Sequence, residues 1–356
     1  MGSRGQYRVA TDRHQGGALT VRAARFHGPD EGLVVEEVPR PEPGPGEVLI
    51  DVSACGLCHS DLHLMHGDLP IPTPRTLGHE AAGEVAATGP GVDHLDPGTS
   101  AVVFGGWGCG HCEVCTRGDD QLCNVLEWAG IGQDGALADF VVVPDAKYVL
   151  PTEIDPVEAA PLTDAALTPY RAVQRAREHL SPTDTLLIVG IGGLGQFGVQ
   201  FAAMTGAQVV AADQDPEKLA LAETLGADVT IDVTQESIQS AIRRVTDDGA
   251  DAAIDFVGKD ETLQACGNAL GTQGRLYIVG IGGGSFELSF NPLVGSELVC
   301  TNVFWGSIDQ LRDVLDLAEA GRLDVGVEPV GFEDLVATYD RLEEGDVDRR
   351  AVLVPE

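Results

Sequence analysis

The sequence contains very little lysine and no long hydrophobic run. Lysine supplies only 3 of the 22 basic residues, against 56 acidic ones, so the formal net charge is −34. A surface this negative repels nucleic acid and anionic membranes, and we expect neither as a partner. No apolar run approaches the roughly 18 residues that a membrane-spanning helix needs, and residues 1–17 lack the apolar stretch of a secretory signal. These absences predict a cytoplasmic protein.

The excess acid is spread along the chain and is not collected in a tail. Repulsion among so many carboxylates is screened at molar salt, where the Debye length falls to about 3 Å. The distribution therefore predicts a halophilic protein whose whole surface is adapted to a salty cytoplasm. An acidic protein of ordinary salt tolerance is the alternative.

Length and composition predict two folded domains. At 356 residues the chain exceeds the size at which one core stops growing, and its 43% hydrophobic and 22% charged residues are ordinary for a globular protein. Residues 21 to about 150 hold short β-prone runs such as GEVLIDVSA and ADFVVVP, typical of a β-rich domain. From about residue 166, strand-like runs alternate with helix-like segments, which predicts an α/β domain with a doubly wound parallel sheet. The tail from about Gly306 shows a helix-like segment, an acidic stretch and a closing strand, RRAVLVP.

The segment GIGGLG at 190–195 follows a buried strand and opens a helix-like segment. In a dinucleotide-binding turn, the first glycine makes the tight turn, the second lets the backbone approach a pyrophosphate, and the third packs the helix closely. The N-terminus of the helix adds N–H donors and a positive dipole. The predicted coenzyme loop consists of Gly190, Gly192, Gly193, Leu194 and Gly195.

Asp213 predicts which coenzyme this loop takes. It ends the next strand, QVVAAD, 23 positions after Gly190, where an acidic residue hydrogen-bonds the adenosine ribose. A carboxylate repels a 2′-phosphate, and the following QDP offers no arginine to receive one. The sequence therefore favours NAD, with NADP as the alternative coenzyme.

Four of the eight cysteines lie within the segment GCGHCEVCTRGDDQLC. Four such thiolates can hold one tetrahedral zinc ion in a closed site that stabilises folding and leaves no position for substrate. An iron–sulfur cluster is the competing interpretation, but the ferredoxin run has a shorter last spacing and a following proline. The predicted structural zinc ligands are Cys109, Cys112, Cys115 and Cys123.

A second candidate metal site combines three segments. Cys58 in CGLCHSDLHLMHGD offers a thiolate, His79 in LGHEAAGEV an imidazole, and Asp164 in PLTDAALTPY a carboxylate. Three protein ligands and an open fourth position are what a catalytic zinc ion needs. Singly, the three residues also fit a buried thiol, a hydrogen-bonded histidine and a helix N-cap.

Together these motifs resemble the zinc-dependent medium-chain alcohol dehydrogenases, in the right order from about residue 21 onward. The resemblance implies a GroES-like catalytic domain at 21–165 and 307–356, with the zinc lobe at about 105–125, and a Rossmann coenzyme domain at 166–306. It implies Cys58 and His79 as zinc ligands and Glu80 as a neighbouring or alternate ligand. The third ligand is commonly a cysteine, so Asp164 is a departure, shared with some secondary-alcohol dehydrogenases in the same PLTDA context. A homo-oligomer, either dimer or tetramer, is usual in the family.

The resemblance also implies roles for individual residues. Ser60 would accept the proton of the substrate hydroxyl and relay it through the coenzyme ribose to His63, which exchanges it with solvent. Asp61 would orient a zinc-ligand histidine. Two further sets are implied: His59 and Arg350 near the pyrophosphate, and Leu69, Phe104 and Trp107 near the substrate pocket. Three cysteines match no ligand position and are expected to be structural: Cys55, Cys266 and Cys300.

The predicted reaction is reversible hydride transfer between NAD and a primary or secondary alcohol, medium-chain or aryl, giving an aldehyde or ketone. A polyol or sugar dehydrogenase of the same fold, or an NADP-preferring carbonyl reductase, is the alternative enzyme. A nucleotide-binding structural or sensor protein without turnover is the alternative from another class. The complete set of Cys58, Ser60, His63 and His79 favours the enzyme, because a scaffold needs no open metal site.

Overall fold

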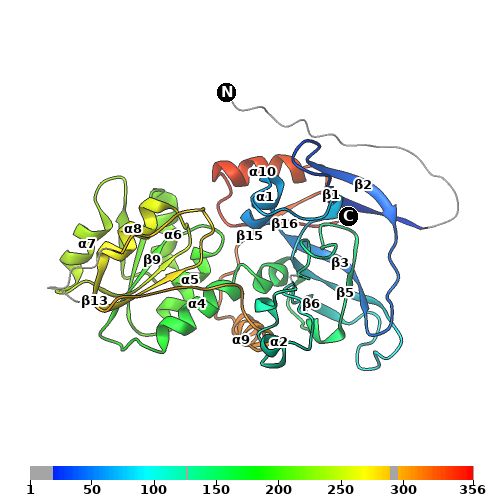
Figure 1. The fold of residues 1–356 in the computed structure, drawn as a ribbon, viewed down its shortest axis with the longest axis horizontal. Coiled ribbons are helices and arrows are strands. Elements are labelled where there is room, and N and C mark those ends of the chain that lie inside the picture. The colour runs from blue at the N-terminus through cyan, green and yellow to red at the C-terminus, as the bar shows by residue number, and fades with distance from the viewer. Residues whose placement is uncertain (1–18, 126, 289–295, 356) are drawn as a thin grey trace. The chain divides into compact units, whose positions relative to one another are not determined.

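The computed structural model describes residues 19–125, 127–288 and 296–355, so most of the N-terminal segment 1–20 lies outside the described residues. The described chain divides into two compact units (Figure 1). One comprises the residues up to Ala165 together with those from Gly306 onward, and the other is Ala166–Trp305. Within these ranges, no helix is both long and apolar enough to cross a membrane.

The first unit contains two sheets. In the smaller sheet, β1 (Thr20–Phe26) pairs antiparallel with β2 (Leu33–Pro39) and with β4 (Arg75–Thr76). The larger sheet has the order β15-β16-β3-β5-β6-β8, and β7 also pairs with β3. Its strands are β3 (Val48–Gly56), β5 (Glu80–Thr88), β6 (Ser100–Val103), β7 (Phe140–Val143), β8 (Val149–Pro151), β15 (Val327–Val330) and β16 (Arg350–Leu353). Most of β3 is buried, as a central strand should be, and the closing strand β16 returns from the end of the chain to pair with it.

Short helices flank these sheets. They are α1 (His59–His66), α2 (Glu113–Thr116), α3 (Pro156–Ala159), α9 (Ile308–Glu319) and α10 (Leu335–Glu344), with the 3-10 turns η1 (Asp120–Leu122), η2 (Ala146–Tyr148) and η3 (Ala160–Thr163). Helix α1 ends at Gly67, whose φ of +81° places it in the left-handed region that glycine adopts without strain. Helix α10 ends in the same way at Gly345. The tail stretch described above only as acidic therefore contains a helix, because its buried face repeats at helical spacing through Leu335, Tyr339 and Leu342.

The second unit is a six-stranded parallel sheet with the order β11-β10-β9-β12-β13-β14. The strands are β9 (Thr185–Val189), β10 (Gln208–Asp213), β11 (Val229–Asp232), β12 (Ala250–Asp255), β13 (Leu270–Ile278) and β14 (Val299–Asn302). The helices are α4 (Leu167–Arg177), α5 (Gly195–Ala203), α6 (Pro216–Thr224), α7 (Ile238–Val245) and α8 (Asp260–Ala269). The strand order reverses between β9 and β12, which makes this the doubly wound arrangement whose ligands bind at the carboxyl ends of the strands.

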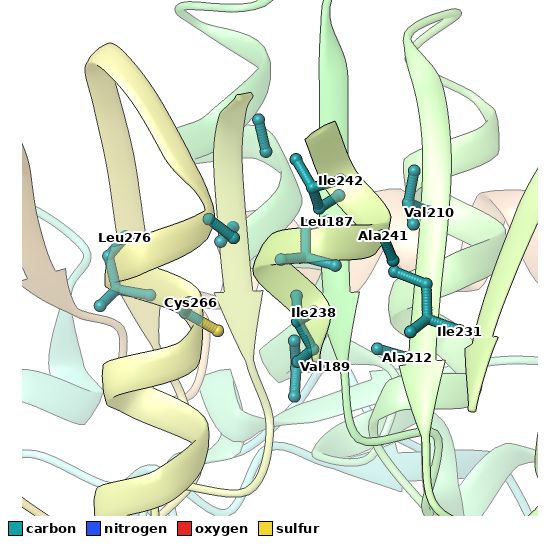
Figure 2. Close-up of a cluster of buried hydrophobic side chains, with 13 residues drawn as sticks. Leu187, Val189, Val210, Ala212, Ile231, Ile238, Ala241, Ile242, Cys266 and Leu276 are labelled. Atoms are coloured by element: carbon teal, nitrogen blue, oxygen red, sulfur yellow. The ribbon is translucent and has the colours of Figure 1, made fainter. Parts of the chain in front are cut away.

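Apolar side chains from strands and helices form the core of this sheet (Figure 2). All five residues of β9 are buried, as expected for a parallel strand covered on both faces. One side of the core joins strand residues to two helices, and it includes Leu187, Val189, Val210, Ala212, Ile238, Ile242 and Cys266. The core holds the carboxyl ends of β9 and β10 in place, and therefore also the coenzyme loop that follows β9.

Candidate metal centres and coenzyme loop

Four buried side chains converge in the first unit, although they are far apart in the sequence. Cys58, His79, Glu80 and Asp164 each offer one ligand atom, and these atoms all lie within 4.8 Å of one another. Oδ2 of Asp164 is 3.7 Å from Sγ of Cys58 and 3.4 Å from Nε2 of His79. Donors bound to one tetrahedral zinc ion are about 3.3–3.8 Å apart, given metal–ligand distances of 2.0–2.3 Å. The thiolate, imidazole and carboxylate therefore fit a shared zinc ion.

Local structure places each of these donors. Cys58 is the N-cap of α1, and its backbone N–H donates to Oδ2 of Asp61, three residues later, at 3.1 Å. His79 directly precedes β5, and Glu80 begins it, paired with Gly56 of β3. Asp164 follows η3, so turns and strand ends bring all four donors together.

The field within this cluster favours positive charge. Burial lowers the pKa of His79, but its contacts with Asp164 and Asp61 outweigh burial and raise that pKa well above its usual value. Burial also raises the pKa of Glu80 to about 7, against the opposing effect of Arg350. A divalent cation at this position would interact favourably with the same acidic groups that here favour protonation.

Arg350 forms a buried ion pair with Glu80. Its Nε is 3.0 Å from Oε2 of Glu80, and its Nη2 contacts the other carboxylate oxygen. Both side chains are fully buried, so the guanidinium compensates a carboxylate inside the protein. Gly56 makes room for this pair, because a Cβ there would lie 1.9 Å from Oε2 of Glu80. Contact of Arg350 with a pyrophosphate stays a prediction.

Three of the predicted residues of α1 differ in their surroundings. Oγ of Ser60 lies 3.5 Å from Sγ of Cys58, at the edge of the metal cluster. His63 is partly exposed, and its Nδ1 is 2.8 Å from Oδ2 of Asp68. His59 is exposed. The structure thus places Ser60 beside the metal cluster, and it places His63 where solvent can reach it.

Asp61 is fully buried and contacts two segments that carry ligands. Besides the backbone of Cys58, it faces His79, whose Nδ1 lies 3.6 Å from its Oδ1. Its Oδ2 also accepts a hydrogen bond of 2.7 Å from the hydroxyl of Tyr339 in α10. Sequence reasoning gave no role to Tyr339, because no motif marks a contact across 278 residues.

The four cysteines of the zinc lobe form a second cluster. Sγ of Cys112 is 3.4 Å from Sγ of Cys115 and 3.9 Å from that of Cys123, and Cys109 is 4.0 Å from Cys115. Four sulfurs around one zinc ion are about 3.8 Å apart. Backbone N–H groups of His111 and Cys112 lower the pKa of Cys109 to about 6, which favours the thiolate that a metal needs. The lobe therefore fits a closed structural zinc site.

A buried polar network fastens this lobe to the sheet. The hydroxyl of Tyr148 donates to Oδ1 of Asp120 at 2.8 Å and accepts from the backbone N–H of Gly108 at 2.9 Å. Nζ of Lys147 lies 2.7 Å from the same Oδ1. Gly108 precedes Cys109 and Asp120 precedes Cys123, so the network holds both ends of the lobe. Sequence reasoning missed it.

The coenzyme loop in the second unit has the glycine geometry that its sequence predicts. Gly190 has a φ of +84°, and a Cβ there would lie 2.5 Å from the side chain of Val257. A Cβ on Gly195 would lie 1.8 Å from the carbonyl oxygen of Gly190, so the turn admits no side chain there. Gly192 faces open space, with no atom within 4 Å of its Cβ position. Leu194 is the N-cap of α5, and the carbonyl of Gly193 accepts from Nε2 of Gln196 at 3.3 Å.

Asp213 braces this loop from the end of β10. Its Oδ2 accepts from the backbone N–H of Ile191 at 2.7 Å, and its Oδ1 accepts from Gln214 at 2.7 Å and Asp215 at 3.0 Å. The carboxylate is thus fixed by backbone donors at the carboxyl edge of the sheet. Its contact with a ribose stays a prediction.

The predicted substrate-pocket residues differ in their exposure to solvent. Leu69 is 38% exposed, whereas Phe104 and Trp107 are fully buried in the first unit. Phe104 stacks on Tyr148, with ring centroids 5.9 Å apart. Of the cysteines outside the metal clusters, Cys55 and Cys266 are buried and Cys300 is exposed. The roles implied for these residues stay predictions.

Comparison with known proteins places both units in one family. Residues 44–153 match the alcohol dehydrogenase GroES-like domain, and residues 193–320 match the zinc-binding dehydrogenase domain. The NAD-dependent alcohol dehydrogenase of Saccharolobus solfataricus is 36% identical over 349 residues, which cover 94% of this chain and 100% of that protein.

Solved structures agree with this assignment. An alcohol dehydrogenase of the hyperthermophilic archaeon Aeropyrum pernix has a TM-score of 0.87 at 35% identity, over 94% of this chain and 100% of that one. An acetophenone reductase of Geotrichum candidum, solved in complex with NAD, has a TM-score of 0.82 at 32% identity, over 94% of this chain and 97% of that one. The predicted GroES-like and Rossmann folds are confirmed. The chain belongs to the zinc-dependent medium-chain alcohol dehydrogenases.

Proposed function

We propose that the protein is an NAD-dependent zinc alcohol dehydrogenase, which interconverts an alcohol and its aldehyde or ketone. The observation that carries the proposal is the convergence of Cys58, His79 and Asp164, with Glu80 beside them, in one buried cluster. The similarity to NAD-dependent alcohol dehydrogenases over nearly the whole chain supports it.

Cys58, His79 and Asp164 would hold the catalytic zinc ion, and Glu80 lies within reach as an alternate ligand. Zinc in such a site supplies Lewis-acid polarisation, which lowers the pKa of an alcohol hydroxyl. The Arg350 guanidinium compensates the carboxylate of Glu80, and the charge of the zinc ion would compensate the remaining acidic ligands. The four-cysteine lobe, which offers no open position, would hold the structural ion.

We assign proton transfer to residues of α1. Ser60, whose Oγ lies 3.5 Å from Sγ of Cys58, would accept the proton of the substrate hydroxyl. His63 is partly exposed and can exchange a proton with solvent.

We assign coenzyme binding to the loop at 190–195, to the N-terminus of α5 and to Asp213, with His59 and Arg350 as further contacts. NAD bound there would accept the hydride from the carbinol carbon. The turn at Gly190, the open side of Gly192 and the backbone donors of α5 suit a pyrophosphate. The negative charge of Asp213 disfavours the 2′-phosphate of NADP.

We further propose a medium-chain or aryl alcohol as substrate, with Leu69, Phe104 and Trp107 near its site. The similarity to an acetophenone reductase supports an aryl ketone on the carbonyl side. We also propose a halophilic protein, dimeric or tetrameric and cytoplasmic. The acidic composition supports halophilic adaptation. The cysteines of the two metal clusters must be reduced to bind zinc, which supports a reducing compartment.

The test follows absorbance at 340 nm in molar salt with zinc present. NAD and NADP are each paired with a primary alcohol, a secondary alcohol and glucose. Turnover of the simple alcohols with NAD, abolished by a chelator, is the expected result. Turnover of glucose alone would identify a sugar dehydrogenase, and no turnover by protein loaded with zinc would indicate a scaffold without catalysis.

A further inference from the structure

Asp61 connects two ligand-bearing segments of the metal cluster through one carboxylate. It is fully buried. Its Oδ2 accepts from the backbone N–H of Cys58 at 3.1 Å, and its Oδ1 faces Nδ1 of His79 at 3.6 Å. A histidine that points Nδ1–H at a carboxylate presents the lone pair of Nε2, and Nε2 of His79 faces Asp164 in the cluster. The orientation of Asp61 therefore decides whether the His79 ring is set for a metal.

The orientation of Asp61 depends in turn on α10. The hydroxyl of Tyr339 donates to Oδ2 at 2.7 Å, and the Tyr339 ring is itself buried. With Tyr339 and the Cys58 N–H both on Oδ2, that oxygen is occupied. Among the described residues, Oδ1 has no hydrogen-bond partner within 3.5 Å, and it faces Nδ1 of His79 at 3.6 Å. Oδ1 is thus available to Nδ1 of His79.

A second contact holds the two helices at the same place. Nε2 of His66, in the last turn of α1, lies 3.3 Å from Oε1 of Glu343 in α10. Both helices belong to the first unit, and Figure 1 shows them next to each other. The two contacts, Tyr339 to Asp61 and Glu343 to His66, are one turn of α10 apart, so α10 is fixed along α1.

We propose that Tyr339 is a positioning residue for the catalytic metal, which acts through Asp61 on His79 and so couples the C-terminal segment to metal retention. This inference rests on the proposed function, because it takes Cys58, His79 and Asp164 as zinc ligands. It extends that function by assigning part of the zinc affinity to a helix about 260 residues after the His79 ligand, with no ligand of its own. A purely structural tyrosine would stabilise the fold and leave the affinity for zinc unchanged.

The experiment measures zinc release from the whole, zinc-loaded protein into an excess of a chromophoric chelator. Tyr339→Phe removes one hydroxyl and keeps the ring. Tyr277→Phe is the matched control, since Tyr277 is also buried and donates one hydrogen bond, to the carbonyl of Arg175 in the second unit, at 3.0 Å. Cys58→Ser, which loses a ligand of one site only, identifies the release phase of the catalytic site.

Loss of a group that contacts a metal ligand directly typically costs about 10–100-fold in metal affinity. Tyr339 acts one contact further away, so Tyr339→Phe is expected to release the catalytic zinc faster by up to about tenfold, the low end of that range. Release from the four-cysteine site should not change, and Tyr277→Phe should leave both phases as in the wild type. The inference would be overturned if Tyr339→Phe released the catalytic zinc at the wild-type rate, or if Tyr277→Phe accelerated that release equally. The proposed function would still stand.

Two further results keep the outcomes distinct. If Tyr339→Phe does not fold, Asp61→Asn removes the charge from the same link and should also accelerate the catalytic phase, and unchanged release in that variant would overturn the inference. If Cys58→Ser removes no release phase from the wild-type pattern, the Cys58 cluster holds no zinc. That result would overturn the proposed function and the inference together.

Discussion

A substitution of Cys58 can separate metal chemistry from coenzyme binding. It lies in the metal cluster of the first unit, whereas the coenzyme loop belongs to the second. Cys58→Ala should lower kcat/KM by about 10³-fold or more, since metal polarisation contributes several kcal/mol and each 1.36 kcal/mol is tenfold in rate. The dissociation constant for NADH, measured by the fluorescence of its reduced nicotinamide, should stay near that of the wild type.

Cys300→Ala is the matched control for this substitution, because the same side chain is removed from an exposed position in β14. It should retain wild-type turnover. Near-normal activity of Cys58→Ala would exclude the zinc mechanism, and loss of NADH binding would mean that the substitution disturbs more than the metal site.

Asp213 should determine coenzyme preference, because its negative charge disfavours a 2′-phosphate. Asp213→Asn removes the charge and can keep one acceptor oxygen for the N–H of Ile191, while its amide group replaces the oxygen that accepts from Gln214 and Asp215. The NAD to NADP ratio of kcat/KM should fall by about tenfold or more, since two unit charges about 4 Å apart near a protein surface interact by about 4 kcal/mol. Asp213→Gly removes the brace as well, so it should weaken the binding of both coenzymes.

Asp232→Asn provides the comparison for coenzyme preference. Asp232 lies opposite Asp213 in the register of β10 and β11 and accepts from its own following loop. This variant should leave the NAD to NADP ratio unchanged. An unchanged ratio in Asp213→Asn would show that other residues select the coenzyme.

Residues within short motifs could be predicted from the sequence, and residues that act across the fold could not. Cys58 and His79 stand in the segments CHSDLH and GHE, so their chemistry is visible without coordinates. Tyr339 has no such context, and its partner Asp61 is 278 positions away. The pairing of Arg350 with Glu80 likewise depends on β16 returning to β3.

At the scale of elements, the zinc lobe depends on a network that begins outside it. Tyr148→Phe removes the donor to Asp120 and leaves the N–H of Gly108 without its acceptor. An unsatisfied buried group costs about 1–3 kcal/mol, so the denaturation midpoint should fall accordingly. Gly108 directly precedes Cys109, and Asp120 lies three residues before Cys123. Zinc release from the four-cysteine site should therefore also become faster.

Tyr277→Phe again supplies the control. It should lower stability to a similar extent and leave the release of zinc from the lobe unchanged. Parallel effects of Tyr148→Phe and Tyr277→Phe on both measurements would show that the network contributes general stability and does not hold the lobe in place.

Local pattern predicted most elements and missed those whose pattern is weak. The run GEVLIDVSA is β3 and RRAVLVP contains β16, since both are apolar and β-prone over four residues or more. Helix α10 was not predicted, because it lies in a stretch identified only as acidic, although Leu335, Tyr339 and Leu342 repeat at helical spacing. Strand β13 begins at Leu270, before the predicted RLYIVGIG, because pairing with β12 extends it through a glycine-containing segment with a register shift. Such pairing is a property of the sheet and is not written in the local sequence.

At the scale of the whole molecule, charge is the dominant unusual property. Even if each of the 22 basic residues neutralised one acid, 34 carboxylates would remain. Their repulsion destabilises the compact state, and it weakens as the Debye length falls from about 10 Å at 0.1 M salt to about 3 Å at 1 M. The midpoint of thermal unfolding and kcat should therefore both rise between low salt and molar KCl, the former by at least several degrees.

Salt also strengthens hydrophobic burial, so screening has to be separated from that effect. Osmolytes such as sucrose stabilise proteins by exclusion from the surface without screening charge, and they provide the comparison at matched conditions. If repulsion dominates, KCl should stabilise the protein far more than sucrose does, and most of the gain should come below about 1 M, where the Debye length changes most. Lowering the pH toward the sequence pI of about 4.3 removes the same negative charge, so the response to salt should shrink there. A flat response to KCl at neutral pH, or equal responses to KCl and sucrose, would contradict the halophilic adaptation and leave the acidic composition without this explanation.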